Sequence, residues 1–317
     1  MDIADLQKLA QRTRSGREIG IALVITSCLL GLLLLIPLGK KTETAPVTTT
    51  ATSTSAIPDA FAQVPLEAKA AIVYDLSTNK ILYAKNSNAQ LPLASLTKLL
   101  TVYAALRELS PNTPITITAD ATRLSAPSAF SAGQIFTLSD LARLTLTASL
   151  NDGAAAIASA TAARQNRSQS AMLASAAAAL GLSQTYAVNG SGLDVNYAIS
   201  GGYGSAYDLA RLAGALVAQA PIIAEATTNS SAQAVSKGGA SFVVKNTDPM
   251  IGTIPRLLLS KTGYTDLAGG NLAIVFDSGI QHPIAIIVLG SSQKARFTDG
   301  TALVAATFAH FAGVASL

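Results

Sequence analysis

Apolar and polar positions alternate in two different ways along this chain, and the difference separates predicted strands from predicted helices. Short runs rich in β-branched and apolar residues are typical of strands, and they lie at 70–75, 81–84, 115–118, 241–244, 257–262, 271–276 and 283–289. Helical spacing of apolar residues, or alanine-rich composition, predicts helices at 95–106, 141–148, 154–163, 171–180, 205–216 and 301–311. Within residues 70–311, most predicted strands come from the two ends, and most predicted helices come from the middle.

This order of elements predicts an α+β fold class. We expect an antiparallel sheet built from both ends of the domain and flanked by helices, with an all-helical lobe inserted between the first strands and the later ones. The turn-forming residues Asp277-Ser278-Gly279 are expected to join the last two strands as a hairpin. A cleft between the sheet and the lobe is the natural place for an active site.

The first sixty residues have a different character. Residues 19–38 carry no charge, and a run of that length is long enough to cross a bilayer as a helix. More basic residues precede this run than follow it, which predicts a cytoplasmic N-terminus. We therefore predict a cytoplasmic basic leader at 1–18, a single transmembrane anchor at 19–38, a disordered Thr/Ser-rich stalk at 39–60 and a catalytic domain at 61–317 outside the cytoplasm.

The N-terminal segment has two other interpretations besides an anchor. A cleaved signal peptide is the first, but the charged leader is long and the apolar run exceeds a usual signal sequence. A lipoprotein is the second, because Ile25-Thr26-Ser27-Cys28 loosely resembles a processing site. The apolar run continues beyond Cys28, so we expect this cysteine to be buried in the membrane.

Composition excludes several classes of protein. The chain has one cysteine and two histidines, His282 and His310, so an internal disulfide, a Ser/His/Asp triad and a histidine-based metal site are not expected. Three of the four net positive charges belong to residues 1–41, and the remaining chain lacks the basic excess that nucleic-acid binding needs. If a serine is activated here, lysine is the remaining candidate base, and no metal or cofactor is expected.

The strongest candidate nucleophile is Ser95. Lys98 follows it by three residues at the start of an apolar helix, so the two side chains project from one face within reach of each other. Pro92 disfavours helix before it, which places Ser95 in the first turn, where unpaired N–H groups stabilise negative charge. Partial burial of Lys98 is expected to lower its pKa toward the range of a general base. A simple helix cap with a solvated lysine is the alternative.

Two further motifs are ambiguous in isolation. Ser149-Leu150-Asn151, followed by Asp152-Gly153, is compatible with an ordinary helix-terminating turn. Lys261-Thr262-Gly263-Tyr264 follows an apolar strand segment, and a lysine there is compatible with protection of an edge strand. Together with Ser95 and Lys98, however, and in the order in which they occur along the chain, these motifs match the S-x-x-K, S-x-N and K-T-G signature of penicillin-binding proteins and β-lactamases.

The resemblance extends well beyond these motifs and covers about residues 65 to 315. Over that range the chain resembles the D-alanyl-D-alanine carboxypeptidases, the low-molecular-mass penicillin-binding proteins. Further matching segments are Asn189 with Gly192-Leu193, Ser205-Ala206-Tyr207-Asp208-Leu209-Ala210, Asn246-Thr247-Asp248-Pro249 and Tyr264-Thr265-Asp266. The resemblance implies a β-lactamase/transpeptidase-like fold and a serine peptidase that removes the terminal D-alanine from peptidoglycan stem peptides. It also implies that β-lactam antibiotics act as covalent inhibitors.

The resemblance implies a role for each motif residue. Ser95 is the expected nucleophile and Lys98 its neutral base, with a cationic Lys261 helping to keep Lys98 neutral. Ser149 is the expected proton relay, and Asn151 orients Lys98 and the substrate amide. Backbone N–H groups of Ser95 and Tyr264 are expected to bind the oxyanion, and Gly263 allows the substrate backbone to lie against the strand. The expected partners of the substrate carboxylate are Lys261, Thr262 and Arg296, although a solvated charge at a helix start is the alternative for Arg296.

Three alternative functions stay open at this point. A D,D-endopeptidase that cuts peptidoglycan cross-bridges uses the same residues. A β-lactamase of class A needs a glutamate soon after S-x-N, and the only glutamate between Asn151 and Lys261 is the distant Glu225. An inactive peptidoglycan-binding homologue is disfavoured because every motif position carries a reactive side chain. The chain also has Leu150 where glycine is common, and it ends at Leu317 where many members carry a further C-terminal β domain.

Overall fold

An antiparallel sheet forms the centre of the fold. A computed structural model of the chain describes residues 59–313, and in this part five strands are ordered β10-β11-β12-β1-β2. Their bounds are β1 Ala70–Asp75, β2 Lys80–Lys85, β10 Leu257–Thr265, β11 Gly269–Asp277 and β12 Pro283–Ser291. The first strand pairs with the last, with Ile72 opposite Ile287. The two ends of the domain therefore build one sheet, as the sequence predicts.

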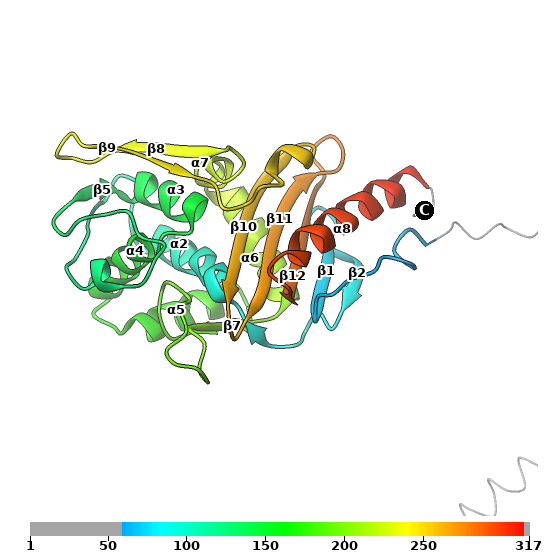
Figure 1. Cartoon of the computed structure of the whole chain (residues 1–317), viewed down its shortest axis with the longest axis horizontal. Helices are drawn as coiled ribbons and strands as arrows, with labels where there is room; N and C mark the ends of the chain where they lie inside the picture. Colours follow the sequence, from blue (N-terminus) through cyan, green and yellow to red (C-terminus); the bar gives the residue numbers. More distant parts are fainter. Residues whose placement is uncertain (1–58, 314–317) are drawn as a thin grey trace, which may run out of the picture. The chain divides into compact units, whose positions relative to one another are not determined.

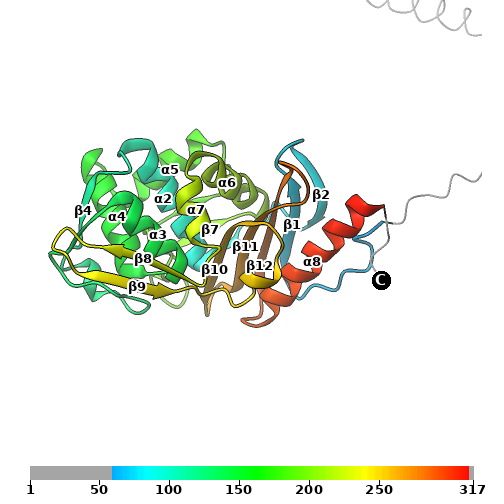
Figure 2. The ribbon, with the colours of Figure 1, turned by 90° about the horizontal axis from the view of Figure 1, so that it is seen from above.

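Alternate residues of the sheet pack on opposite faces. Along β12, Ala285, Ile287 and Leu289 belong to one buried apolar cluster, whereas Ile284, Ile286 and Val288 belong to a second. This alternation is the two-residue period of a strand that is covered on both sides. Helix α8 (Ala295–Ala312) covers one face and α6 (Ala206–Gln219) covers the other (Figure 2).

The middle of the chain forms a lobe on the side of the sheet opposite α8 (Figure 1). Its helices are α2 Thr97–Glu108, α3 Leu138–Ala148, α4 Asn151–Arg164, α5 Gln169–Ala179 and α7 Pro221–Ala226. Its short 3₁₀ helices are η1 Ala94–Leu96 and η2 Ala121–Arg123, and η3 Ile251–Thr253 precedes β10. Apolar side chains of these helices join the same cluster as one face of the sheet.

The lobe is not all-helical, and this part of the prediction is wrong. It also carries short antiparallel ladders, which are β4 Pro114–Thr116 with β5 Ile135–Thr137, β8 Ser231–Val235 with β9 Ser241–Lys245, and β3 Leu91–Pro92 with β7 Gly202–Gly204 and β6 Tyr186–Ala187. The strand expected at 241–244 pairs with β8 rather than with the central sheet. In β8 only alternate residues are buried, whereas every residue of β1 is buried, so β8 has one packed face.

Three element boundaries differ from those expected, and each matters for the site. Ser95 lies in η1, one short turn ahead of α2. Helix α4 begins at Asn151 and not near Ala154, which leaves a very short connection from α3. Helix α8 begins at Ala295 and not near Thr301, and this adds a turn that carries Arg296. Its N-cap residue is Lys294, which makes no capping hydrogen bond through its side chain, while the Ser292 hydroxyl accepts a hydrogen bond from the N–H of Ala295.

The predicted leader at 1–18, the anchor at 19–38 and all of the predicted stalk except residues 59 and 60 lie outside the described residues. Ala60, just before the predicted start of the domain, is fully buried. Within residues 59–313, no helix is both long enough and apolar enough to cross a membrane.

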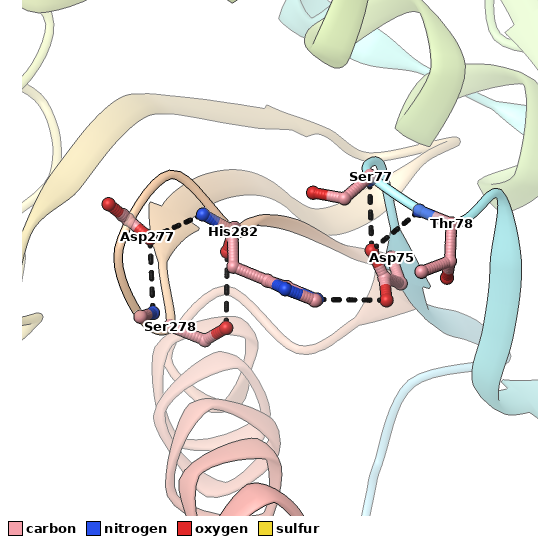
Figure 3. A network of polar contacts seen from close by, with 7 residues as sticks. Asp75, Ser77, Thr78, Asp277, Ser278 and His282 are labelled. Carbon is pink, nitrogen blue, oxygen red and sulfur yellow. Dashed lines mark hydrogen bonds and ion pairs between the residues drawn. The ribbon is translucent and has the colours of Figure 1, made fainter.

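At one end of the sheet, a polar network joins the β1–β2 turn to the β11–β12 turn (Figure 3). The Asp75 carboxylate is buried, accepts hydrogen bonds from the N–H groups of Ser77 and Thr78 at 2.9 and 3.1 Å, and pairs with His282 Nε2 at 2.9 Å. Asp277 accepts from the N–H of His282 at 2.9 Å. His282, whose sequence context does not suggest catalysis, therefore connects two turns that are distant in the chain.

Replacing Asp75 by alanine is expected to lower the free energy of unfolding at pH 7 by about 2 kcal/mol, because it removes a buried acceptor of three partly buried hydrogen bonds, two of them from the N–H groups of Ser77 and Thr78 and one from His282. Urea unfolding measures this, and Asp120→Ala, in an exposed ion pair, is the control with a loss below about 0.5 kcal/mol. Burial raises the pKa of Asp75, but hydrogen bonds from Thr78 and His282 outweigh burial and lower the pKa overall. The contribution of the Asp75 carboxylate to the free energy of unfolding is therefore full above about pH 4 and is lost as the pH falls further. If the difference in unfolding free energy between the wild type and Asp75→Ala stays constant down to pH 2, this explanation is contradicted.

Candidate active site

Ser95 and Lys98 lie side by side where η1 leads into α2. Lys98 Nζ is 2.8 Å from Ser95 Oγ; Ser95 is half-buried and Lys98 is fully buried. Ala94, the residue before the serine, has a left-handed φ of 47°, a conformation that costs a non-glycine residue roughly 1 kcal/mol or more. After this backbone turn Ser95 remains partly exposed while Lys98 is buried in the core.

The partners of Lys98 suit a neutral amine. Besides Ser95, Lys98 Nζ contacts Asn151 Oδ1 at 2.8 Å and the carbonyl oxygen of Ser191 at 2.7 Å. A neutral amine has two hydrogens and one lone pair, so it can donate to these two oxygens and accept from the Ser95 hydroxyl. Burial lowers the pKa of Lys98 to about 7, although the nearby Asp152 carboxylate opposes this. The amine is therefore partly neutral at physiological pH and is placed to remove the Ser95 proton.

Ser149 and Asn151 come from the short connection between α3 and α4. Ser149 ends α3 with a left-handed φ of 59°, and Asn151 already belongs to α4, so the chain reverses over two residues. Leu150, where the resemblance would favour glycine, has ordinary extended dihedrals and is buried. A side chain at this position therefore fits the connection without backbone strain. Asn151 Nδ2 also donates to the carbonyl oxygen of Ser125 at 2.9 Å, which fixes the orientation of its amide.

Lys261, Thr262 and Gly263 lie on β10, at the edge of the sheet next to the lobe. Lys261 Nζ donates to Ser149 Oγ at 2.8 Å and to the carbonyl oxygen of Thr262 at 2.6 Å. Its side chain is 1% exposed, so it does not lie on the surface to protect the strand edge against pairing with another strand, and that alternative is wrong. A Cβ on Gly263 would lie 3.3 Å from the backbone nitrogen of Ser95. The strand therefore passes directly beside the candidate nucleophile.

The surroundings of Lys261 lower the pKa of its amine. Burial lowers its pKa well below the ordinary value, and the positive charges of Lys98 and Arg296 lower it further, while Asp248 opposes them. This direction acts against the positive charge that the resemblance implies for Lys261. Two buried amines so close together share protons as a coupled pair.

Arg296 reaches the same strand from the first turn of α8. Its Nη1 donates to the carbonyl oxygen of Gly263 at 2.7 Å, and its side chain is 8% exposed, so the alternative of a solvated charge is wrong. Its Nε is buried without a hydrogen-bond partner among the described residues. Tyr264, the next residue on β10, has a 44% exposed side chain. The arginine thus offers an unused donor close to the strand.

Several contacts of the site were missed by sequence reasoning. The Ser191 carbonyl is a backbone group, and side-chain patterns carry no signal for it. Thr247 shares a hydrogen bond of 2.7 Å with the Thr262 hydroxyl, and Asp248 accepts from the Ser260 hydroxyl. Both belong to the segment Asn246–Pro249 that the resemblance had singled out, so a signal existed for them.

The described residues hold no cluster of three or more histidine, cysteine, aspartate or glutamate side chains that could bind a metal ion. His282 is paired with Asp75, and the His310 ring packs near that of Phe61 at a centroid distance of 5.6 Å. The side chains joined by hydrogen bonds at the site are two serines, two lysines and an asparagine, namely Ser95, Ser149, Lys98, Lys261 and Asn151.

Comparison with known proteins gives consistent matches. Residues 54–293 match the family model described as D-alanyl-D-alanine carboxypeptidase. A D-alanyl-D-alanine endopeptidase of Pseudomonas aeruginosa is 31% identical over 265 residues, which cover 80% of this chain and 82% of the relative. The D-alanyl-D-alanine carboxypeptidase DacF of Bacillus subtilis is 30% identical over 253 residues, covering 77% of this chain and 63% of the relative. This chain therefore matches less than two thirds of that longer protein.

A solved structure matches the fold in the same way. The ampicillin-bound form of penicillin-binding protein D2 from Listeria monocytogenes superimposes with a TM-score of 0.65 at 29% identity. The match covers 77% of this chain and 98% of that protein.

Proposed function

The chain belongs to the D-alanyl-D-alanine carboxypeptidase family, and from this premise we propose that it removes the terminal D-alanine from peptidoglycan stem pentapeptides through a Ser95 acyl-enzyme. One observation carries the proposal. Ser95 Oγ lies 2.8 Å from the amine of a fully buried lysine. Lys261, on the strand β10 that borders Ser95, donates a hydrogen bond to Ser149. A nucleophile and a base that can be neutral are the minimum requirement for acyl transfer.

Acylation needs one bond to form and one to break. Ser95 Oγ attacks the carbonyl carbon of the penultimate D-alanine, and its proton passes to the neutral Lys98 amine. The backbone N–H groups of Ser95 and Tyr264 are the proposed donors to the oxyanion. When the C–N bond breaks, the leaving amine of D-alanine receives a proton. The Lys98, Ser149 and Lys261 side chains supply this proton, with Asn151 holding Lys98 in place. Water then hydrolyses the ester.

The C-terminal carboxylate of the substrate is proposed to bind at Lys261, Thr262 and Arg296. Two observations support this: the Arg296 Nε is buried without a hydrogen-bond partner among the described residues, and the Thr262 hydroxyl shares a hydrogen bond with Thr247. A bound carboxylate brings a negative charge to Lys261 and raises the pKa of that amine. Substrate binding would thus move the coupled lysine pair toward a charged Lys261 and a neutral Lys98.

Arg296→Gln is expected to reduce the preference of the enzyme for a peptide with a free C-terminal carboxylate over its C-terminal amide about tenfold in kcat/KM, because one charged donor is lost. The comparison of two substrates on one variant separates carboxylate binding from general damage. Arg256→Gln, an arginine near the opposite end of β10 whose Nε donates to the Asp277 carbonyl oxygen, is the control. An unchanged preference in Arg296→Gln would remove this residue from the binding site.

Release of D-alanine tests the proposed activity directly. The full chain is incubated with an acyl-L-Lys-D-Ala-D-Ala peptide, and free D-alanine is measured. Turnover that is absent in Ser95→Ala is the expected result. No release from this peptide, with cleavage of a cross-linked muropeptide dimer instead, would favour the D,D-endopeptidase, the second candidate named by the Pseudomonas aeruginosa relative.

Two other candidates have less support. A β-lactamase of class A would need a glutamate beside the acyl-enzyme, and Glu225 lies exposed on α7. An inactive binding protein does not need a lysine buried in contact with a serine, a costly arrangement unless it is used. A long-lived penicillin adduct distinguishes the peptidase from a β-lactamase, which would release it quickly.

We also propose that residues 19–38 anchor the chain in the cell membrane with the catalytic domain outside. The charge-free run and the basic residues before it support this, as does the location of peptidoglycan outside the cytoplasm. Fractionation of cells is the test: the full chain should stay with membranes after alkaline washing, and a chain lacking residues 19–38 should not. Recovery of the full chain in the soluble fraction would refute the anchor.

A further inference from the structure

A cavity of about 460 Å³, with both polar and apolar surface, lies next to the catalytic residues, within the size range of sites that bind small ligands. Its walls come from the segment after β4, from α4 and α5, and from the loop 189–194. Most lining side chains are polar. The proposed mechanism uses none of the side chains in these walls.

The cavity shares two walls with the catalytic centre. Ser191 lines it, and the Ser191 carbonyl oxygen contacts Lys98 Nζ at 2.7 Å. Ser125 lines it as well, and its carbonyl oxygen accepts from Asn151 Nδ2 at 2.9 Å. A ligand in the cavity would therefore be separated from the reacting groups by a single layer of backbone.

The charges of the cavity favour a cation. Three of its lining residues are charged, namely Asp120, Arg123 and Asp194. Asp120 and Arg123 pair with each other at 3.0 Å, which cancels their charges locally. The half-buried Asp194 carboxylate then gives the cavity a net negative charge.

Asp194 is also linked to the substrate strand. The Thr265 hydroxyl on β10 donates to Asp194 Oδ1 at 3.2 Å. Thr265 lies two residues beyond Gly263, which borders Ser95, and residues two apart on a strand point to the same side about 6.8 Å from each other. A peptide lying along β10 with its carboxylate at Thr262 and its scissile bond at Gly263 would bring its preceding residue to Asp194.

The geometry points to a specificity subsite: Asp194 binds the protonated side-chain amine of the residue that precedes the D-Ala-D-Ala dipeptide. This inference rests on the proposed peptidase function, because it assumes that a D-Ala-D-Ala peptide occupies the site. The ligand class is a diamino-acid side chain of the lysine type. Its aliphatic part would cross the cavity, and its ammonium group would reach the carboxylate.

Binding to Ser95→Ala tests the subsite without requiring turnover. Calorimetry on the full chain compares Nα-acetyl-L-Lys-D-Ala-D-Ala with the same peptide carrying L-norleucine, which has no amine. The lysine peptide is expected to bind about fivefold more tightly, the scale of a half-exposed charge pair. This ratio should fall to about one when Asp194→Asn is added, since asparagine can still accept from Thr265 but carries no charge.

Two further variants keep the test decisive. Adding Asp266→Asn, an exposed carboxylate on the turn after β10 that does not line the cavity, should leave the fivefold ratio intact. Adding Arg123→Gln on the exposed rim should raise the ratio about twofold, because Asp120 is then no longer neutralised. Equal affinities for the two peptides, or a ratio that survives Asp194→Asn, would overturn the subsite. If the wild type releases D-alanine while the affinities are equal, only the subsite fails; if the ratio holds but no D-alanine is released, only the peptidase fails.

Discussion

Benzylpenicillin is expected to add one covalent acyl group to the tryptic peptide 86–98 of the full chain, and Ser95→Ala is expected to abolish the adduct. The reason is the contact of 2.8 Å between Ser95 Oγ and Lys98 Nζ, which activates one hydroxyl in the site. Loss of the nucleophile removes the acylation route altogether, so the acylation rate should fall by at least about 10³-fold. Mass spectrometry of the digested protein measures both results.

The peptide 86–98 offers its own control. It contains a second serine, Ser87, which is buried and whose carbonyl oxygen accepts from the N–H of Tyr207 on α6. Ser87→Ala should keep the full adduct, and fragmentation should place the acyl group on Ser95 in that variant. An adduct on any other peptide, or one that persists in Ser95→Ala, would contradict the assignment of the nucleophile.

The second large effect concerns the pH dependence of acylation. Burial lowers the pKa of Lys98 to about 7, and only the neutral amine can accept the Ser95 proton. The second-order rate constant with penicillin should therefore rise about tenfold per pH unit up to about pH 7 and then level off. Lys98→Arg should lower it by at least about 10³-fold at every pH, because a guanidinium stays protonated.

Stopped-flow or fluorescent-penicillin kinetics between pH 5 and 9 measure this profile. Lys80→Arg, at an exposed lysine of β2, should leave it unchanged. His282→Gln should also keep the profile, since His282 belongs to the distant network with Asp75, and this variant excludes the histidine as the titrating group. A rate that is flat across the range would show that Lys98 is not the base.

Sequence patterns predicted the central sheet well but missed elements with weak local preference. The segment Ser231–Val235 alternates polar and apolar residues, yet two of its five residues are alanine, which has low strand propensity. It forms β8 because β9 pairs with it and one face is covered. The start of α8 was missed because Lys294 and Arg296 are typical of a solvent-exposed segment before a helix. Only the tertiary structure shows that Arg296 is buried.

Sequence alone determined which side chains are available for the reaction and how neighbours within one turn are arranged. Ser95 and Lys98 face each other because positions three apart on a helix share a face, and no distant part of the chain is needed for that. The separation of Lys261 from Ser149 is 112 positions, and only the folding of β10 against the lobe brings these two side chains to 2.8 Å.

The tertiary structure also decided the chemistry of these groups. A lysine near pKa 7 and an arginine with an unpaired Nε both result from burial, and burial is the sum of packing from segments far apart in the chain. Local spacing can therefore specify a nucleophile and its neighbour, whereas the removal of water that makes the neighbour a base requires the whole domain.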